Sequence, residues 1–184
     1  MSELDELLAW SKAPVPEVLQ QLQPQQQQEV HSWAKNLVDR ETEGLDDLYN
    51  AIAMIVKYIP NFMVIPLMVE HIRPRIAAQV CIKMGIDQST GYANDLPLEY
   101  FSKVSSHLDE KMMAQILTKM KRSQVEKFII MALQQNPTRI LDIASHLERP
   151  VLEIVAKYVV FPEENSELAI SHHKPIIDKI RSMQ

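Results

Sequence analysis

The chain has 184 residues, of which 46% are hydrophobic and 23% are charged, and its formal net charge is −5. These proportions are those of an ordinary globular domain. The one cysteine, Cys81, excludes a disulfide framework and a zinc cluster built on several thiolates. Only three glycines occur, which argues against β-hairpins and phosphate-binding loops, because both depend on glycine for positive φ angles.

Charge is distributed unevenly along the chain. Residues 1–50 carry a net charge of −7 and residues 51–184 carry +2. A nucleic-acid-binding protein draws its affinity mainly from neutralising phosphates, so this pattern argues against that class. The acidic N-terminus is unlike a signal peptide, and a lysine and two prolines interrupt the longest apolar stretch, residues 52–69. We therefore expect a cytoplasmic protein of bacterial type, with no membrane insertion and no nucleic-acid partner.

Residues 1–42 are predicted to be an acidic N-terminal helical segment. Its first helix has Ser2 as N-cap and an apolar face formed by Leu4, Leu7, Leu8 and Trp10. Pro24 opens a longer helix, because proline is tolerated in a first helical turn.

Residues 43–162 are predicted to form a body of helical repeats, and residues 163–184 a C-terminal capping helix, with all three segments in one compact unit. The body begins with a helix over residues 45–56. Its apolar residues cover more than one side, so we expect this helix near the centre of the core.

The body contains a segment that repeats. Residues 71–84 and 107–120 align without a gap at an offset of 36, and residues 146–159 keep the histidine and the apolar positions. The identical pairs are His71/His107, Ala78/Ala114, Gln79/Gln115, Lys83/Lys119 and Met84/Met120. A period in the thirties is typical of stacked helical units, each too small to bury its apolar face alone.

Each copy is predicted to be a pair of short helices joined at its histidine. Pro60, Pro97 and Pro137 mark the starts of the first helices, and Asn136 is a good N-cap before Pro137. We therefore expect an all-α fold, arranged as an irregular α-solenoid of helix pairs. Two segments interrupt it: residues 85–95, which lack helical periodicity and are expected to form a loop at the rim, and an extra helix that starts at Ser123, with Glu126 completing a capping box.

The second copy and the residues before it resemble a known family. The matching residues are Leu96-Pro97-Leu98-Glu99-Tyr100-Phe101-Ser102-Lys103-Val104, His107-Leu108-Asp109-Glu110, Met113-Ala114, Ile116-Leu117 and Met120. They resemble the helical repeats of the MgtE intracellular N domain, which are similar to helical units of the flagellar motor protein FliG. The resemblance covers about residues 60–160 and implies a right-handed, HEAT-like superhelix used for protein contacts. The region is near neutral where that family is acidic, so no magnesium site is carried across.

No pattern in the sequence predicts an enzyme, a cofactor or a metal site. His71, His107 and His146 recur at a spacing of about one repeat, roughly 10 Å for packed helices, which is too long for one shared metal. We interpret them as turn residues that bond the last carbonyls of the preceding helices. The adjacent His172 and His173 are interpreted as a solvated helix start rather than a metal site, and the Cys81 thiol as a buried hydrophobic group.

The methionines concentrate in the repeats, where they either fill the core or line a groove that adapts to a partner helix. The predicted function is that of an adaptor, which binds a protein partner such as an amphipathic helix through a Met-rich concave surface. The alternative is a regulatory domain that responds to a small molecule bound between its helices. The candidate partner-binding residues are Leu4, Leu8, Trp10, Phe62, Met63, Met68, Tyr92, Tyr100, Phe101, Met112 and Met113.

Overall fold

The computed structural model describes residues 15–161 and 172–184. Throughout these residues the elements are helices joined by turns, without a strand, so the predicted all-α class is confirmed. The chain divides into two compact units, residues 1–48 and 49–184. This division falls within α4 (Leu45–Val56), six residues after the boundary drawn from the sequence. Leu4, Leu8 and Trp10 lie outside the described residues.

The described part of the first unit contains α2 (Glu17–Gln20) and α3 (Pro24–Glu41), neither of which has a buried residue. Local hydrogen bonds connect them. The side-chain amide of Gln27 donates to the carbonyls of Leu19 and Leu22, at 3.2 and 3.1 Å. The Gln23 amide donates to the side chain of Gln26 at 3.0 Å, which completes a capping box at the start of α3. Hydrogen bonds from polar side chains, rather than an apolar core, therefore stabilise the connection between α2 and α3.

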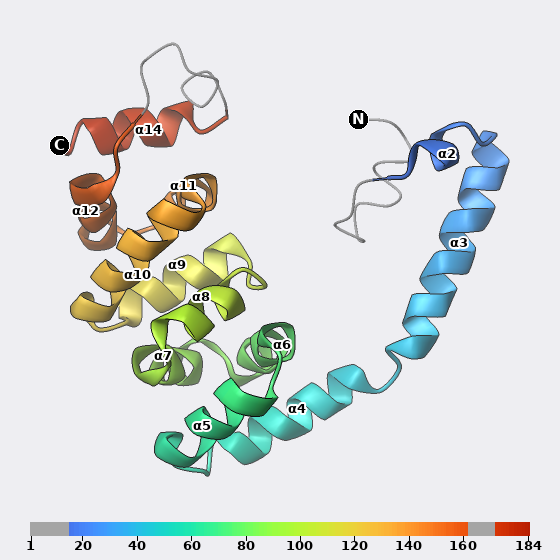
Figure 1. Ribbon diagram of the computed structural model, residues 1–184, viewed down its shortest axis with the longest axis horizontal. Coiled ribbons are helices and arrows are strands. Elements are labelled where there is room, and N and C mark those ends of the chain that lie inside the picture. The colour runs from blue at the N-terminus through green and yellow to red at the C-terminus, as the bar shows by residue number, and fades with distance from the viewer. Residues whose placement is uncertain (1–14, 162–171) are drawn as a thin grey trace. The chain divides into compact units, whose positions relative to one another are not determined.

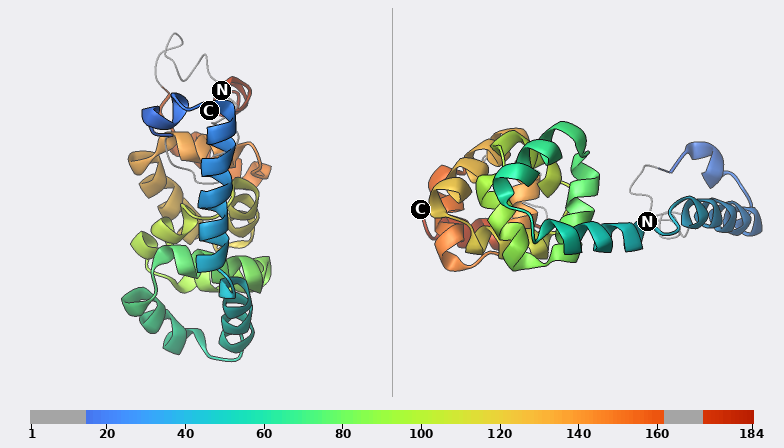
Figure 2. Two further views of the ribbon diagram at one scale, coloured as in Figure 1. Left: turned by 90° about the vertical axis from the view of Figure 1, so that its right-hand side faces the viewer. Right: turned by 90° about the horizontal axis from the view of Figure 1, so that it is seen from below.

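The second unit contains the later turns of α4 and a succession of short helices (Figures 1 and 2). They are α5 (Asn61–His71), α6 (Pro74–Met84), α7 (Ile86–Asp95), α8 (Leu98–Ser105), α9 (Glu110–Lys119), α10 (Arg122–Gln135), α11 (Pro137–Ala144), α12 (Arg149–Tyr158) and α14 (Lys174–Arg181). The three predicted helix pairs are present as α5–α6, α8–α9 and α11–α12.

Each pair is followed along the chain by a third helix, and the contacts between helices recur every three helices. The first helix of a copy packs on its third in α5–α7, α8–α10 and α11–α14. The second helix of one copy packs on the first of the next in α6–α8 and α9–α11. The third packs on the second of the next in α7–α9 and α10–α12. The packing unit is therefore three helices, and α14 takes the place of the third helix in the last copy.

Residues 85–95 do not form the expected rim loop, because all but the first of them make up α7. Ser89, Thr90, Tyr92 and Ala93 are buried there. The hydroxyl groups of Ser89 and Thr90 donate to the carbonyls of Cys81 and Ile86, at 2.9 and 2.8 Å. Backbone bonding of this kind lets small polar residues occupy a buried helix face, which explains why the apolar periodicity is missing from the sequence.

The two glycines that suggested a loop have different roles. Gly85 joins α6 to α7 with φ +80° and ψ 172°, a conformation essentially restricted to glycine, whereas Gly91 lies within α7 and is exposed. A Cβ atom at either position would meet nothing within 4 Å, so only the backbone distinguishes them.

The same substitution at these two glycines is expected to change stability in opposite directions. Gly85→Ala should lower the free energy of unfolding by about 1–3 kcal/mol, because alanine is strained at this positive φ. Gly91→Ala should raise it by about 0.4–1 kcal/mol, because alanine is the better helix former and restricts the unfolded chain. Urea unfolding followed by circular dichroism measures both, and a shift of the same sign in the two variants would contradict the assignment of α7.

The core of the second unit extends from α6 to α14 and becomes thin toward α4 and α5. The ring of Phe128 in α10 packs against Phe101 in α8, with ring centroids 5.0 Å apart and an angle of 58° between planes. In contrast, α5 has no buried residue and α4 has only Ala53. The expectation that α4 lies near the centre of the core is therefore wrong. Its apolar residues face the edge of the core, and several of them are exposed.

Candidate functional site

An apolar groove lies among α4, α5, α6 and α7, with a volume of about 300 Å³. Aliphatic, methionine and aromatic side chains line it. The residues are Ile52, Val56, Ile59, Met63, Val64, Leu67, Met68, Ile72, Ile76, Ala77, Val80, Met84 and Tyr92. We call this set the apolar groove.

The outer wall of the apolar groove is α5, which is apolar on every side. Its residues from Phe62 to Val69 are all hydrophobic, yet none is buried. Phe62 is 77% exposed, Met63 52% and Leu67 60%. A helix that is apolar all round is normally covered, and contiguous exposed apolar surface commonly marks a site of interaction. The groove is therefore open to solvent along α5.

Two tyrosine hydroxyls form hydrogen bonds with backbone carbonyls at the ends of the helices that line the groove. Tyr92 of α7 donates to the carbonyl of Val56 at 3.2 Å, and Tyr100 of α8 donates to the carbonyl of Ile72 at 2.6 Å. Burial raises the pKa of Tyr100 to about 12 and moves the pKa of Tyr92 in the same direction. Both hydroxyls therefore remain protonated donors at neutral pH and fix the ends of α4 and α5.

The structure places the candidate residues in different environments. Met63, Met68 and Tyr92 line the apolar groove, and Phe62 projects from the same helix as Met63. The remaining described candidates are buried in the core and do not line the apolar groove, so they are not part of this site. These are Tyr100, Phe101, Met112 and Met113.

The aliphatic part of the site, which includes Ile59, Leu67 and Ile72, is not among the residues predicted from the sequence. A signal for it was present in the uninterrupted apolar run of α5, although such a run is equally typical of a buried helix. Only the position of α5 at the edge of the core distinguishes the two cases.

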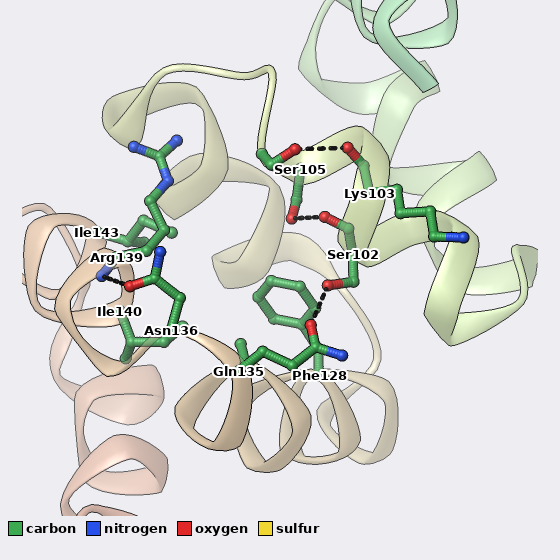
Figure 3. A pocket seen from close by; sticks show the side chains of 11 residues that line it. Ser102, Lys103, Ser105, Phe128, Gln135, Asn136, Arg139, Ile140 and Ile143 are labelled. Carbon is green, nitrogen blue, oxygen red and sulfur yellow. Dashed lines mark hydrogen bonds between the residues drawn. The ribbon is translucent and has the colours of Figure 1, made fainter. Parts of the chain in front are cut away.

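A second hollow, of about 260 Å³, lies between α8, α10 and α11 (Figure 3). The Ser102 hydroxyl donates to the side-chain oxygen of Gln135 at 3.1 Å, and the Ser105 hydroxyl donates to the Ser102 carbonyl at 2.7 Å. The Asn136 side chain accepts from the amide of Arg139 at 3.1 Å, so it is the predicted N-cap of α11. These bonds join helices and cap them, which is a structural role.

The three repeated histidines are exposed and lie at or just after helix ends. The backbone amides of His107 and His146 donate to the carbonyls of Val104 and Ile143, each at 3.0 Å. The interpretation of the later pair needs correction. His172 is exposed, but His173 is only 4% exposed and its ring nitrogen lies 2.7 Å from a carboxylate oxygen of Asp142.

Neither a family model, a curated protein nor a solved structure matches this chain. Among the described helices, none combines the length and the apolar character needed to cross a membrane.

Proposed function

We propose that this chain is a non-enzymatic adaptor that binds an amphipathic helix of a partner protein in the apolar groove. The observation that carries this proposal is α5, a helix hydrophobic on every side that has no buried residue and forms one wall of the groove. A partner helix would cover this surface by inserting its apolar stripe.

The size of the exposed surface sets the expected affinity. Because they are only 52–77% exposed, complete burial of Phe62, Met63 and Leu67 would contribute about 1–2 kcal/mol for each side chain. Association costs several kcal/mol in lost freedom of motion, so the net affinity is expected to be micromolar rather than picomolar.

The wider architecture assigned to the chain belongs to the same proposal. The repeated three-helix contacts support an irregular α-solenoid. Its expected right-handed, HEAT-like superhelix rests on the resemblance to the helical repeats of the MgtE intracellular N domain and of FliG. A protein of this kind is expected to act in the cytoplasm, where Cys81 stays reduced.

One observation favours a second candidate, a regulatory domain that binds a small apolar molecule. Met63, Met68 and Met84 all line the apolar groove, and its volume of about 300 Å³ lies at the lower end of the range for small-molecule sites. Methionine adapts to ligands as readily as to partner helices.

A charge placed in the groove distinguishes it from other apolar surface. In affinity capture from a lysate of the native host, Leu67→Glu is expected to lose a stoichiometric partner that the wild type retains, because the substitution puts a carboxylate in the apolar contact. Val160→Glu is the matched control, since Val160 is 90% exposed and lies after α12, away from the groove. Circular dichroism should show both variants folded.

The captured protein then supplies a sharper test. A peptide spanning its amphipathic helix should bind the wild type and Val160→Glu, and should bind Leu67→Glu at least tenfold more weakly. Equal capture by both variants would remove the groove as the binding surface. Thermal stabilisation of the wild type by fatty acids, with no partner captured, would favour the small-molecule alternative.

A further inference from the structure

Three potential metal ligands lie close together between α11 and the start of α14, although these two helices are well separated in sequence. Asp142 lies on α11, and His172 and His173 immediately precede the first residue of α14. The Nε2 atom of His173 lies 2.7 Å from Oδ1 of Asp142, and the Nε2 atom of His172 lies 3.8 Å from the same oxygen. The two imidazole centroids are 3.8 Å apart. We call these three residues the His–Asp cluster.

A simple hydrogen bond explains only part of this geometry. A buried histidine bonded to a carboxylate accounts for His173, but the exposed His172 also directs its Nε2 atom toward the same oxygen. One ligand atom from each of the three residues lies within 4.8 Å of the others. Tetrahedral zinc, with bonds of about 2.0–2.1 Å, separates its ligand atoms by about 3.3 Å. The two distances to Asp142 differ from this value by about 0.5–0.6 Å, and the ligand atoms of the two histidines, which lie within 4.8 Å of each other, would have to approach by at most about 1.5 Å.

The His–Asp cluster borders an open hollow of about 570 Å³, which Glu110 and His146 also line. Glu110 is engaged by the guanidinium of Arg139, and its pKa is lowered by its own backbone hydrogen bond and by Arg139. Asp142, which lines the same hollow, opposes this lowering of the pKa. Asp142 is thus a carboxylate beside two imidazoles, with space on the side of the hollow for water as a further ligand.

We propose that Asp142, His172 and His173 bind a zinc ion through two imidazole nitrogens and one carboxylate oxygen. This donor set suits Zn²⁺, whereas Mg²⁺ and Ca²⁺ prefer oxygen ligands alone. The ion would link α14 to α11 and so fasten the last helix of the unit. The site is separate from the apolar groove and does not depend on the proposed partner.

Zinc titration of the full chain, purified without a histidine tag, tests this proposal by isothermal calorimetry. The wild type is expected to bind one Zn²⁺ per chain and to unfold at a higher temperature in its presence, because a ligand bound only to the folded state stabilises that state. His172→Ala and Asp142→Asn should each weaken binding by roughly 100-fold or more, since even supporting residues around a metal change affinity by about 10–100-fold.

His107→Ala is the matched control, because His107 is an exposed turn histidine in the preceding copy, outside the cluster. It should bind zinc as the wild type does. Since His172 is exposed, its substitution leaves the core intact and keeps the test valid even if Asp142→Asn destabilises α14. No zinc binding by the wild type, undiminished binding by His172→Ala, or equally tight binding of Mg²⁺ would each overturn the proposal.

Discussion

Phe128→Ala is expected to lower the free energy of unfolding by about 3–5 kcal/mol, the cost typical of removing a buried aromatic ring. Phe128 is 2% exposed, and its ring packs against Phe101 at the junction of α8 and α10. The substitution removes the apolar burial, the ring contact and the support of the surrounding helices, and leaves a cavity. Urea unfolding of the full chain followed by circular dichroism measures the change.

Phe62→Ala provides the control for the same chemical change. Because Phe62 is 77% exposed, its substitution is expected to alter the free energy of unfolding by no more than about 0.5 kcal/mol. If Phe62→Ala were as destabilising as Phe128→Ala, Phe62 would have to be packed within the folded chain. The apolar surface of α5 would then be covered from within, and the proposed partner site would be lost.

The Cys81 thiol is expected to react with iodoacetamide at pH 8 at least about 100-fold more slowly in the folded chain than in urea. Burial raises its pKa from 9.0 to about 11, opposed in part by a hydrogen bond with Ser89. Only the thiolate reacts, and raising the pKa from 9.0 to about 11 lowers the thiolate fraction at pH 8 by about 100-fold, while poor access slows the reaction further. Mass spectrometry of the alkylated chain over time measures both rates.

The same pKa rise gives stability a dependence on alkaline pH. The folded state favours the protonated thiol, so the stability that Cys81 contributes is complete below pH 9 and is lost as the pH rises toward 11. Cys81→Ala should reduce this loss without abolishing it, because Tyr92 and Tyr100 also have raised pKa values.

In the alkylation experiment, a folded chain that reacts as fast as the unfolded chain would show that Cys81 is not buried.

Local signals in the sequence were sufficient for the repeated helix pairs. The apolar spacing within residues 71–84, 107–120 and 146–159 gave the helix type, and Asn136 was correctly identified as the N-cap of α11. These features depend on neighbours three or four positions away, which the sequence displays directly. The all-α class follows from them.

Signals that depend on distant neighbours were misinterpreted. Glu126 was expected to cap its own helix, but α10 begins at Arg122, and Glu126 instead accepts hydrogen bonds from Lys157 and Tyr158 of α12. Likewise, the sequence of α7 lacks apolar periodicity because hydroxyl groups occupy part of its buried face, and this pattern predicts a loop. Tertiary contacts determine both outcomes, and no local pattern reports them.

The candidate sites also depend on contacts between residues that are distant in the sequence. Met63 and Met113 have identical side chains, and each has an apolar residue directly before and after it, yet one lines an open groove and the other is fully buried. His172 and His173 were visible as a pair, but the carboxylate beside them comes from Asp142, and only the packing of α14 on α11 brings it there.

The three-helix packing has a consequence for how the second unit folds. Its principal contacts join helices that are near one another along the chain, and none of them joins α5 to α12 or α14. Ordering can therefore start within one copy and spread to the next without first closing a loop across the whole unit, which favours rapid folding. The copy formed by α8, α9 and α10 has neighbours on both sides, so it is the natural nucleus from which structure would propagate toward the two ends.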